Sequence, residues 1–296
     1  MTFILVSLKK EIEYFLDILK NVKKGKVSKY TIYSGRIHEK EVTVIKTGIG
    51  RKPLDLDMFN DCSRIISAGF CGALVPNLKS GDIVVSTEVM LAETGFLDRL
   101  FKGAGWPASF SGQPKSFKEQ PAPSVDQAAS SGEVPETSGE RIMSFDEIGL
   151  LKNPAAESLY GSLSGSFQSA DVNKISGQFQ GTGFNKISGP FQNDDFKIHA
   201  GRTVTASRAI RNYKEKVCLG RAAGAVSVDM EDYYRMETAK RLGVPCVSVR
   251  AVLDEVHDDI PGFRSGLHFH SAITTLLGRF QPAKMNIAFV LEKVCQ

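Results

Sequence analysis

Short apolar runs that end at glycine or at a charged residue recur along the chain. Residues 3–7, 42–47 and 65–68 form three such runs, rich in β-branched side chains and of the length of buried strands. Residues 226–229 and 247–253 have the same character, and an acidic residue follows shortly after each run. The pattern therefore predicts an α/β protein with a largely buried, mostly parallel sheet.

The last two runs predict a strand–helix–strand unit. Residues 233–242 repeat apolar side chains on one helical face, and Gly-Val-Pro at 243–245 stops the helix. A right-handed crossover of this size places its two strands parallel. Glu231 and Asp254 would then open toward one edge of the sheet, where ligands bind.

Each candidate acid also has an ordinary structural interpretation. An acidic residue after a strand is often a helix cap or a solvated loop residue, which applies to Glu231. Asp254 begins an acidic stretch that would suit a surface turn closed by Pro261. Glu11, just beyond the first strand, suits the first turn of a helix, where the dipole favours acids. The three carboxylates need independent support.

Glycines also follow the predicted strands, at Gly48, Gly50, Gly69 and Gly72. Without a side chain, such residues let backbone amides approach a ribose, a base or a phosphate. Any one of them is explained by a tight turn, but their repetition after strands favours a binding rim.

Several blocks stand in a fixed order: Thr-Gly-Ile-Gly-Arg at 47–51, Ser-Ala-Gly-Phe-Cys-Gly-Ala-Leu at 67–74, Lys-Ser-Gly-Asp-Ile-Val-Val-Ser at 79–86, Val-Asp-Met-Glu at 228–231 and Arg-Ala-Val-Leu-Asp-Glu at 250–255. Together they resemble the nucleoside phosphorylase and nucleosidase family, which includes methylthioadenosine/S-adenosylhomocysteine nucleosidases. The last two blocks are similar to a bacterial branch that contains hopanoid-associated phosphorylases. The resemblance implies a single three-layer α/β domain with a twisted mixed, mostly parallel sheet.

The resemblance also implies a role for each acid in breaking the bond between a ribose and a purine. Asp254 is expected to hydrogen-bond or protonate N7 of the leaving base, and such general acid help typically gives about two to four powers of ten in rate. Met230 and Glu231 are expected to hold the ribose, close to its growing positive charge. Glu11 is expected to position and activate the attacking water. Asp254 requires a raised pKa to be an acid at neutral pH.

Further substrate contacts are expected at Gly48, Gly69, Phe70 and Ile210. Phe70 stands where nucleosidases commonly have a small hydroxyl residue. Ala209 stands where methylthioadenosine nucleosidases place the aromatic that stacks on adenine, which the hopanoid-associated branch also lacks. These departures bear on base and substrate specificity more than on the reaction.

Hydrolysis is favoured over phosphorolysis. A phosphate site usually combines arginines with backbone amides, and Ser67 stands where uridine-type phosphorylases carry a phosphate-binding arginine. Arg51 and Arg208 are the candidate phosphate ligands, although each is also read as a surface charge. Inorganic phosphate would be the co-substrate of a phosphorylase. We expect no metal and no organic cofactor.

Composition narrows the class of protein. The chain has 296 residues, 42% of them hydrophobic, which suffices for one α/β core. A net charge of +4 without a basic, aromatic-bearing stripe argues against nucleic acid as a partner. Five cysteines without Cys-x-x-Cys spacing indicate reduced thiols in a cytoplasmic protein, and the five histidines form no zinc motif. No leader and no membrane span are predicted, and the relatives suggest a homo-oligomer.

A low-complexity insertion is predicted at about residues 101–195, where Gly, Ser, Pro and Gln dominate. Residues 162–197 contain a twelve-residue period in which Ser-Gly-x-Phe-Gln occurs three times. Sequence duplication in a tolerant loop is one interpretation, and a small β-rich flap is another. Within the insertion only residues 144–151 and 154–163 suit a helix, and 101–139 are expected to be irregular.

Ordered structure is expected to resume near Phe196 and to end in a helix at residues 285–294. The whole chain, 1–296, is therefore interpreted as one interrupted nucleoside phosphorylase-like domain. The leading hypothesis is an enzyme that cleaves the N-glycosidic bond of a purine nucleoside. The alternative is a binding or scaffold protein that kept the fold but lost turnover. Retention of three carboxylates favours the enzyme, whereas Phe70 and Ala209 keep the alternative open.

Overall fold

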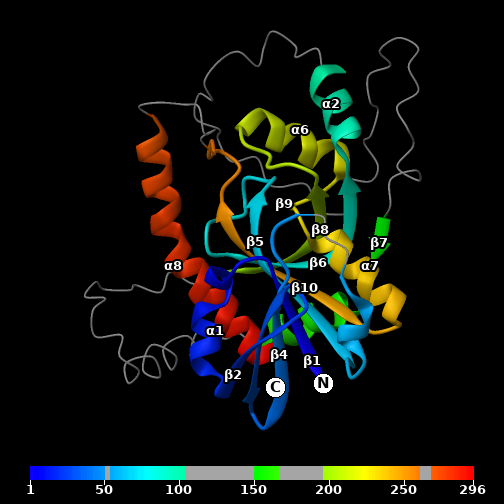
Figure 1. Ribbon diagram of the computed structural model, residues 1–296. Helices are drawn as coiled ribbons and strands as arrows, with labels where there is room; N and C mark the ends of the chain where they lie inside the picture. Colours follow the sequence, from blue (N-terminus) through cyan, green and yellow to red (C-terminus); the bar gives the residue numbers. More distant parts are fainter. Residues whose placement is uncertain (51–53, 104–149, 167–195, 261–267) are drawn as a thin grey trace.

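The computed structural model describes residues 1–50, 54–103, 150–166, 196–260 and 268–296 (Figure 1). Along these residues the elements are β1 (Thr2–Val6), η1 (Lys9–Glu11), α1 (Glu13–Ile18), β2 (Lys20–Val27), β3 (Tyr30–Ile37), β4 (Lys40–Lys46), η2 (Leu56–Phe59), β5 (Arg64–Ala73), β6 (Ile83–Ala92), α2 (Thr94–Gly103), β7 (Leu150–Lys152), α4 (Pro154–Ser166), β8 (Ile198–Ala206), α6 (Tyr213–Ala223), β9 (Ser227–Asp229), α7 (Asp232–Leu242), β10 (Cys246–Asp254) and α8 (His268–Val294). Strands alternating with helices confirm the α/β class.

The strands form one mixed sheet that closes on itself at one end. Their order is β10-β6-β8-β9-β5-β1-β4-β3-β2, and β10 also pairs with β5, so that the first five strands make a barrel-like ring. Of the pairings between described strands, five are parallel and five antiparallel. The prediction of a mostly parallel sheet is therefore wrong. Antiparallel pairing comes from the β2-β3-β4 meander, whose short turns allow no other direction, and from strands that join the ring in reverse.

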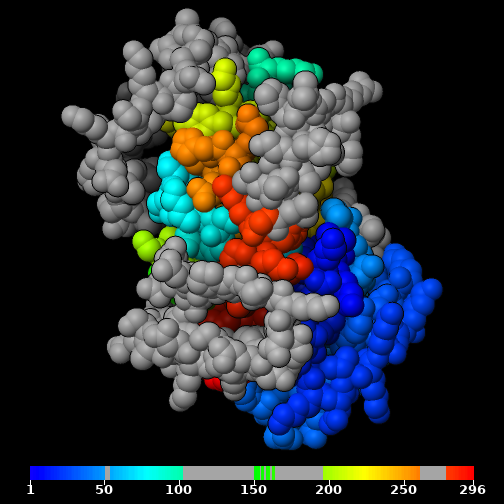
Figure 2. Space-filling view, turned by 90° about the vertical axis from the view of Figure 1, so that its left-hand side faces the viewer, coloured from blue at the N-terminus to red at the C-terminus, as the bar shows by residue number. Residues whose placement is uncertain are grey.

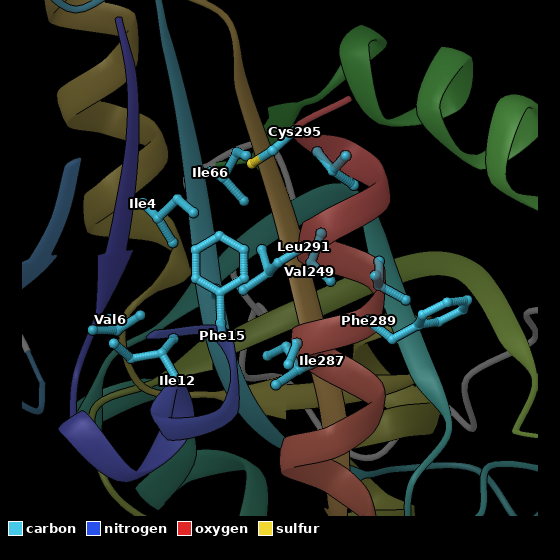
Figure 3. Packing of buried hydrophobic residues seen from close by; sticks show 14 of the residues in the cluster. Ile4, Val6, Ile12, Phe15, Ile66, Val249, Ile287, Phe289, Leu291 and Cys295 are labelled. Atoms are coloured by element: carbon cyan, nitrogen blue, oxygen red, sulfur yellow. The ribbon is translucent and has the colours of Figure 1, made fainter. Parts of the chain in front are cut away.

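Helices cover both faces of the open part of the sheet. The side chains of β1 point alternately to one face and to the other, and so pack against different helices. Phe3 and Leu5 pack in the cluster that contains Met236 of α7. Ile4 and Val6 face the other way, into the cluster formed with α1 and α8 (Figure 3). In the space-filling view the amino-terminal strands form a blue lobe beside the red helix α8 (Figure 2).

The two strands that end at the predicted acidic edge do not run parallel. β9 is antiparallel to β5, whereas β10 is parallel to β5 on its other side. The expected parallel crossover is therefore wrong, because β9 enters the ring between β8 and β5 and takes its direction from β8. The helix between them is confirmed. α7 begins at Asp232, one residue earlier than predicted, and ends at Leu242; the φ of 68° at the next residue, Gly243, suits a glycine C-cap.

Other predicted elements are confirmed with altered lengths. The runs at 3–7 and 42–47 lie in β1 and β4, and residues 65–68 belong to the ten-residue β5. The helix at 154–163 is confirmed as α4. The closing helix was predicted too short, because α8 begins at His268 and continues through Pro282.

Much of the predicted insertion lies outside the described residues, including 104–149 and 167–195 with most of the repeat. Two details within it are wrong. Residues 101–103 are the end of α2, and Leu150 and Leu151 belong to β7 rather than to a helix. Among the described helices, none has the length and apolar character required to cross a bilayer.

Candidate functional site

Two glycines on β5 let two acids approach the strand closely. A Cβ on Gly69 would lie closest to Nη1 of Arg250 and 3.1 Å from Oε1 of Glu11, and a Cβ on Gly72 would stand 2.7 Å from Oδ2 of Asp254. Three residues of a strand span about 10 Å. Glu11 and Asp254 therefore occupy two places along one strand, and each depends on a missing side chain.

Glu11 is fixed by the backbone that precedes it. It ends the short helix η1, and its Oε2 accepts hydrogen bonds from the amides of Ser7 (2.7 Å) and Leu8 (2.9 Å). The carboxyl is buried. Burial raises its pKa, and the nearby Arg235 guanidinium opposes that rise. Glu11 is therefore a buried, backbone-anchored carboxyl with a raised pKa, rather than a solvated first-turn acid.

Glu231 lies at the loop that follows β4. It is buried at the N-cap of α7, and its Oε1 accepts a 2.8 Å hydrogen bond from the amide of Gly50. Gly48 and Gly50 have φ angles of 86° and 76°, which favour glycine. Beside them, Glu231 and Arg235 help to line a cavity of about 10 Å³, which is room for about one water molecule.

Asp254 ends β10 at an irregularity in the sheet. Val252 pairs with Cys71 and Asp254 with Gly72, so Leu253 is an extra residue on β10. Bulges of this kind re-aim a side chain and recur beside active sites. Burial raises the pKa of the Asp254 carboxyl, and the ammonium of Lys216, 2.6 Å away, acts in the opposite sense. The pKa moves in the direction that a general acid requires.

The structure brings Glu11 and Glu231 together and sets Asp254 apart. Glu231 contributes to the raised pKa of Glu11, and both carboxylates act on the buried Arg235. Asp254 pairs instead with a residue of α6. The site thus has a two-carboxylate end near Gly69 and a one-carboxylate end near Gly72.

A buried charge network beneath the acids was missed by the sequence analysis. Arg250, with no exposed side-chain surface, lies 2.8 Å from Oδ2 of Asp229 and bonds both oxygens of Asp232. Burial and the neighbouring Asp232 raise the pKa of Asp229 to about 7. Burial also acts to raise the pKa of Asp232, but Arg250 outweighs it and lowers that pKa. The available signal was a charged residue inside the apolar run 246–254.

The same network contains Ser67. Its hydroxyl donates to Asp232 at 2.5 Å and accepts from Arg235 and Arg250, each at 3.0 Å. One nitrogen of the network, Nη1 of Arg250, is buried, faces Gly69 and has no hydrogen-bond partner within the described part of the chain. Ser67 is therefore an interior residue that holds the network together.

The candidate phosphate ligand Arg208 is already paired. Its guanidinium contacts Oε1 of Glu215 at 2.7 Å and donates to the carbonyl of Ala209 at 3.1 Å. Arg208, Ala209 and the start of α6 line a surface pocket of about 340 Å³. Arg51, the other candidate, lies outside the described residues.

The remaining expected contacts differ in what their side chains face. Phe70 packs edge-on against Phe280 of α8, with ring centroids 5.4 Å apart. Ile210 is buried in the core cluster beneath α6. Met230 is half-buried between β9 and α7. Within the ranges that the structure describes, no cluster of three or more His, Cys, Asp or Glu side chains is placed to hold a metal.

Sequence comparison with known proteins matches part of the chain. The phosphorylase superfamily model matches residues 2–144. The 5'-methylthioadenosine/S-adenosylhomocysteine nucleosidase of Buchnera aphidicola is 35% identical over 92 residues, which are 29% of this chain and 36% of that protein. The matched segment therefore spans about a third of the length of this relative.

Solved structures match the whole chain at low identity. The nucleosidase of S. pneumoniae with a transition-state inhibitor has a TM-score of 0.60 at 16% identity, covering 100% of this chain and 98% of that one. The Helicobacter pylori 5'-methylthioadenosine/S-adenosyl homocysteine nucleosidase gives 0.58 at 16%, covering 99% and 96%. The futalosine hydrolase of the same species gives 0.57 at 15%, covering 98% and 94%. At these identities the likeness establishes a common fold.

Proposed function

We propose that this chain, which belongs to the nucleoside phosphorylase and nucleosidase superfamily, cleaves the N-glycosidic bond of a purine nucleoside by hydrolysis. The observation that carries the proposal is the placement of Glu11 and Asp254 against Gly69 and Gly72. Both acids are buried with raised pKa values, and Glu231 lies beside Glu11. Functional acid–base groups are characterised by such environments.

On the base side, Asp254 donates a proton or a hydrogen bond to N7 of the purine. The departing base would otherwise leave as an anion, so protonation lowers the barrier. Desolvation keeps a proton on this carboxyl to higher pH than on a solvated aspartate.

On the sugar side, Glu231 and Met230 hold the ribose while positive charge grows at C1′. A carboxylate near that carbon stabilises the developing cation. Glu11 accepts a proton from the attacking water, and the glycines at 48 and 69 let the backbone approach the sugar. The backbone amides at Ser7 and Leu8 fix the Glu11 carboxylate in place for this step.

Water is preferred to phosphate as the nucleophile. Arg208 is neutralised by Glu215, and Ser67 is enclosed in the charge network. The second candidate is a phosphorylase, which would transfer the glycosyl group to phosphate. Arg51 and Arg208 would then be the phosphate ligands. A non-catalytic nucleoside-binding protein is the third.

The relatives suggest the substrate class and the setting. A 5'-methylthioadenosine or adenosylhomocysteine-like nucleoside is the preferred substrate, since the matched proteins carry those names. Ala209 offers no ring for stacking on the base. We further propose that the chain forms one interrupted domain, assembles as a homo-oligomer and acts in nucleoside metabolism without a metal or an organic cofactor. A cytoplasmic location is proposed because the unpaired cysteines suit a reducing compartment.

The test is chromatographic detection of free base. The pure protein is incubated with methylthioadenosine, adenosylhomocysteine, adenosine and inosine, each with and without phosphate. Base release without phosphate supports hydrolysis, and strict dependence on phosphate supports the second candidate. Absence of release under every condition, with binding of a nucleoside retained, would support the third.

A further inference from the structure

Lys216 is a lysine enclosed inside the molecule. It lies on α6, and its side chain has no exposed surface. Its Nζ lies 2.6 Å from Oδ2 of Asp254 and donates to the carbonyls of Glu255 (2.7 Å) and Asp258 (2.8 Å). An ammonium has three donors, and three oxygens surround this one. Burying such a charge is costly unless it is paired, so the position of Nζ is strongly determined.

We propose that Lys216 is a positioning residue for Asp254, holding its carboxyl against Gly72 and balancing its charge. The inference rests on the proposed function, because it concerns how the base-side acid is held. No motif in the sequence marks Lys216, and its contact with the site arises only when α6 packs beside the end of β10.

The helix that carries Lys216 is itself tied to the segment after β10. The amide of Tyr213 donates to Oδ1 of Asp259 at 3.1 Å, and the Tyr213 ring stacks on His257 with centroids 4.8 Å apart. The amide of Ile260 donates to the carbonyl of Arg211 at 2.7 Å. These contacts fix the first turn of α6 on the loop that Lys216 binds, so the lysine is held in one place.

The charges that face Asp254 come from three elements. Lys216 lies on α6, Asp258 on the loop after β10, and Arg279 on α8; Cys71 of β5 is adjacent and buried as a thiol. Arg279 is engaged with Asp258 in an ion pair. Among the residues that the structure describes, Lys216 is thus the cation in direct contact with the carboxyl. Removing its charge should let Asp254 keep its proton to higher pH while losing the contact that orients it.

The experiment compares Lys216→Met with Lys216→Arg. Base release is measured across pH, with kcat and KM separated, after the wild-type protein has been shown to release base. In Lys216→Met we expect kcat to fall about 10- to 100-fold, as misplaced groups do, with a smaller change in KM. The alkaline limb of the pH profile should rise by about one pH unit or more. Lys216→Arg should restore the wild-type limb, and Lys214→Met, exposed on the same helix, should match wild type.

A double variant separates positioning from general damage. In the Asp254→Asn background, Lys216→Met should change kcat by less than about twofold, because the group through which it acts is gone. An unmoved alkaline limb, or an equal loss of kcat in both backgrounds, would overturn the inference. Lys216→Gln, which keeps donors for the two carbonyls, replaces Lys216→Met if the latter does not fold.

A second readout does not depend on activity. The carboxyl carbon of Asp254, labelled with ¹³C and assigned with Asp254→Asn, is titrated by NMR in wild type and in Lys216→Gln. A higher pKa in the variant supports the inference, and an equal pKa refutes it. If the wild-type protein released no base, only the proposed function would be refuted. The titration would still decide whether Lys216 controls the pKa of Asp254.

Discussion

Oε1 of Glu231 accepts a hydrogen bond from the amide of Gly50, which precedes it by 181 residues. Gly50 has a φ of 76°, a conformation that favours glycine. The bond ties the loop after β4 to the start of α7. The proposed sugar side of the candidate site therefore depends on a backbone conformation as well as on a carboxylate.

Glu231→Gln should reduce base release without unfolding the protein. The amide oxygen of glutamine still accepts the bond from Gly50, but the negative charge that we propose to lie near C1′ is lost. We expect kcat to fall about 10²- to 10³-fold, as for other losses of transition-state electrostatic stabilisation. Glu237→Gln, exposed on the same helix, is the control. Wild-type kcat in Glu231→Gln would exclude Glu231 from the ribose site.

Gly72→Ala should disturb Asp254 directly. The new Cβ would stand 2.7 Å from Oδ2, and Lys216 leaves the carboxyl little freedom to move. We expect kcat to fall by about two powers of ten and the free energy of unfolding to fall by about 1–3 kcal/mol. Steady-state kinetics and urea titration measure the two effects.

The matched control for that variant is Gly25→Ala on β2. A Cβ at Gly25 meets no atom of the described residues within 4 Å, so neither kcat nor the free energy of unfolding should change appreciably. A Gly72→Ala protein with the kinetics of wild type would mean that the position of Asp254 does not limit the reaction.

The local sequence pattern was sufficient to predict elements that are marked by their own residues. The β-branched run at 65–68 identified β5, and the glycine at 243 identified the end of α7. Strand direction was not predictable in the same way. β9 has three residues, and its direction is decided by pairing with β5 and β8, which are distant in sequence.

The residues of the candidate site also differ in how far the local sequence predicts them. Glu11, Glu231 and Asp254 follow strands, so their sequence position already placed them near a rim. Lys216 carries no such mark, because its partner lies 38 residues further along the chain and meets it only through packing. The role of Arg250 depends likewise on Asp229 and Asp232 meeting it across the ring of strands.

Phe70→Ser should weaken the fold more than it changes substrate binding. Gly69 faces Glu11, and the next residue of a strand faces the other way, where Phe70 packs against Phe280. Loss of a half-buried ring should lower the free energy of unfolding by about 1–3 kcal/mol. KM for the nucleoside should change less than about threefold. A large fall in KM would instead show that the new hydroxyl reaches the sugar.

The free energy of unfolding should depend on pH because of the titration of Asp229. Its pKa is raised to about 7 by burial and by Asp232, above the 3.8 of an unperturbed aspartate. The folded state therefore binds the extra proton, and the stability that this group contributes is complete below about pH 4. It is lost as pH rises through about 7, at up to about 1.4 kcal/mol per pH unit.

Asp229→Asn removes that titration. The free energy of unfolding of wild type minus that of the variant should decline from pH 5 to pH 8, measured by urea titration at each pH. Asp232→Asn is the matched control, because the pKa of Asp232 is lowered. The stability that Asp232 contributes is therefore present above the pKa of an unfolded aspartate and is lost only at acid pH. The corresponding difference for Asp232→Asn should not decline over that range. A difference for Asp229→Asn that is constant or grows with pH would show that Arg250 keeps Asp229 ionised, since the two lie in contact at 2.8 Å.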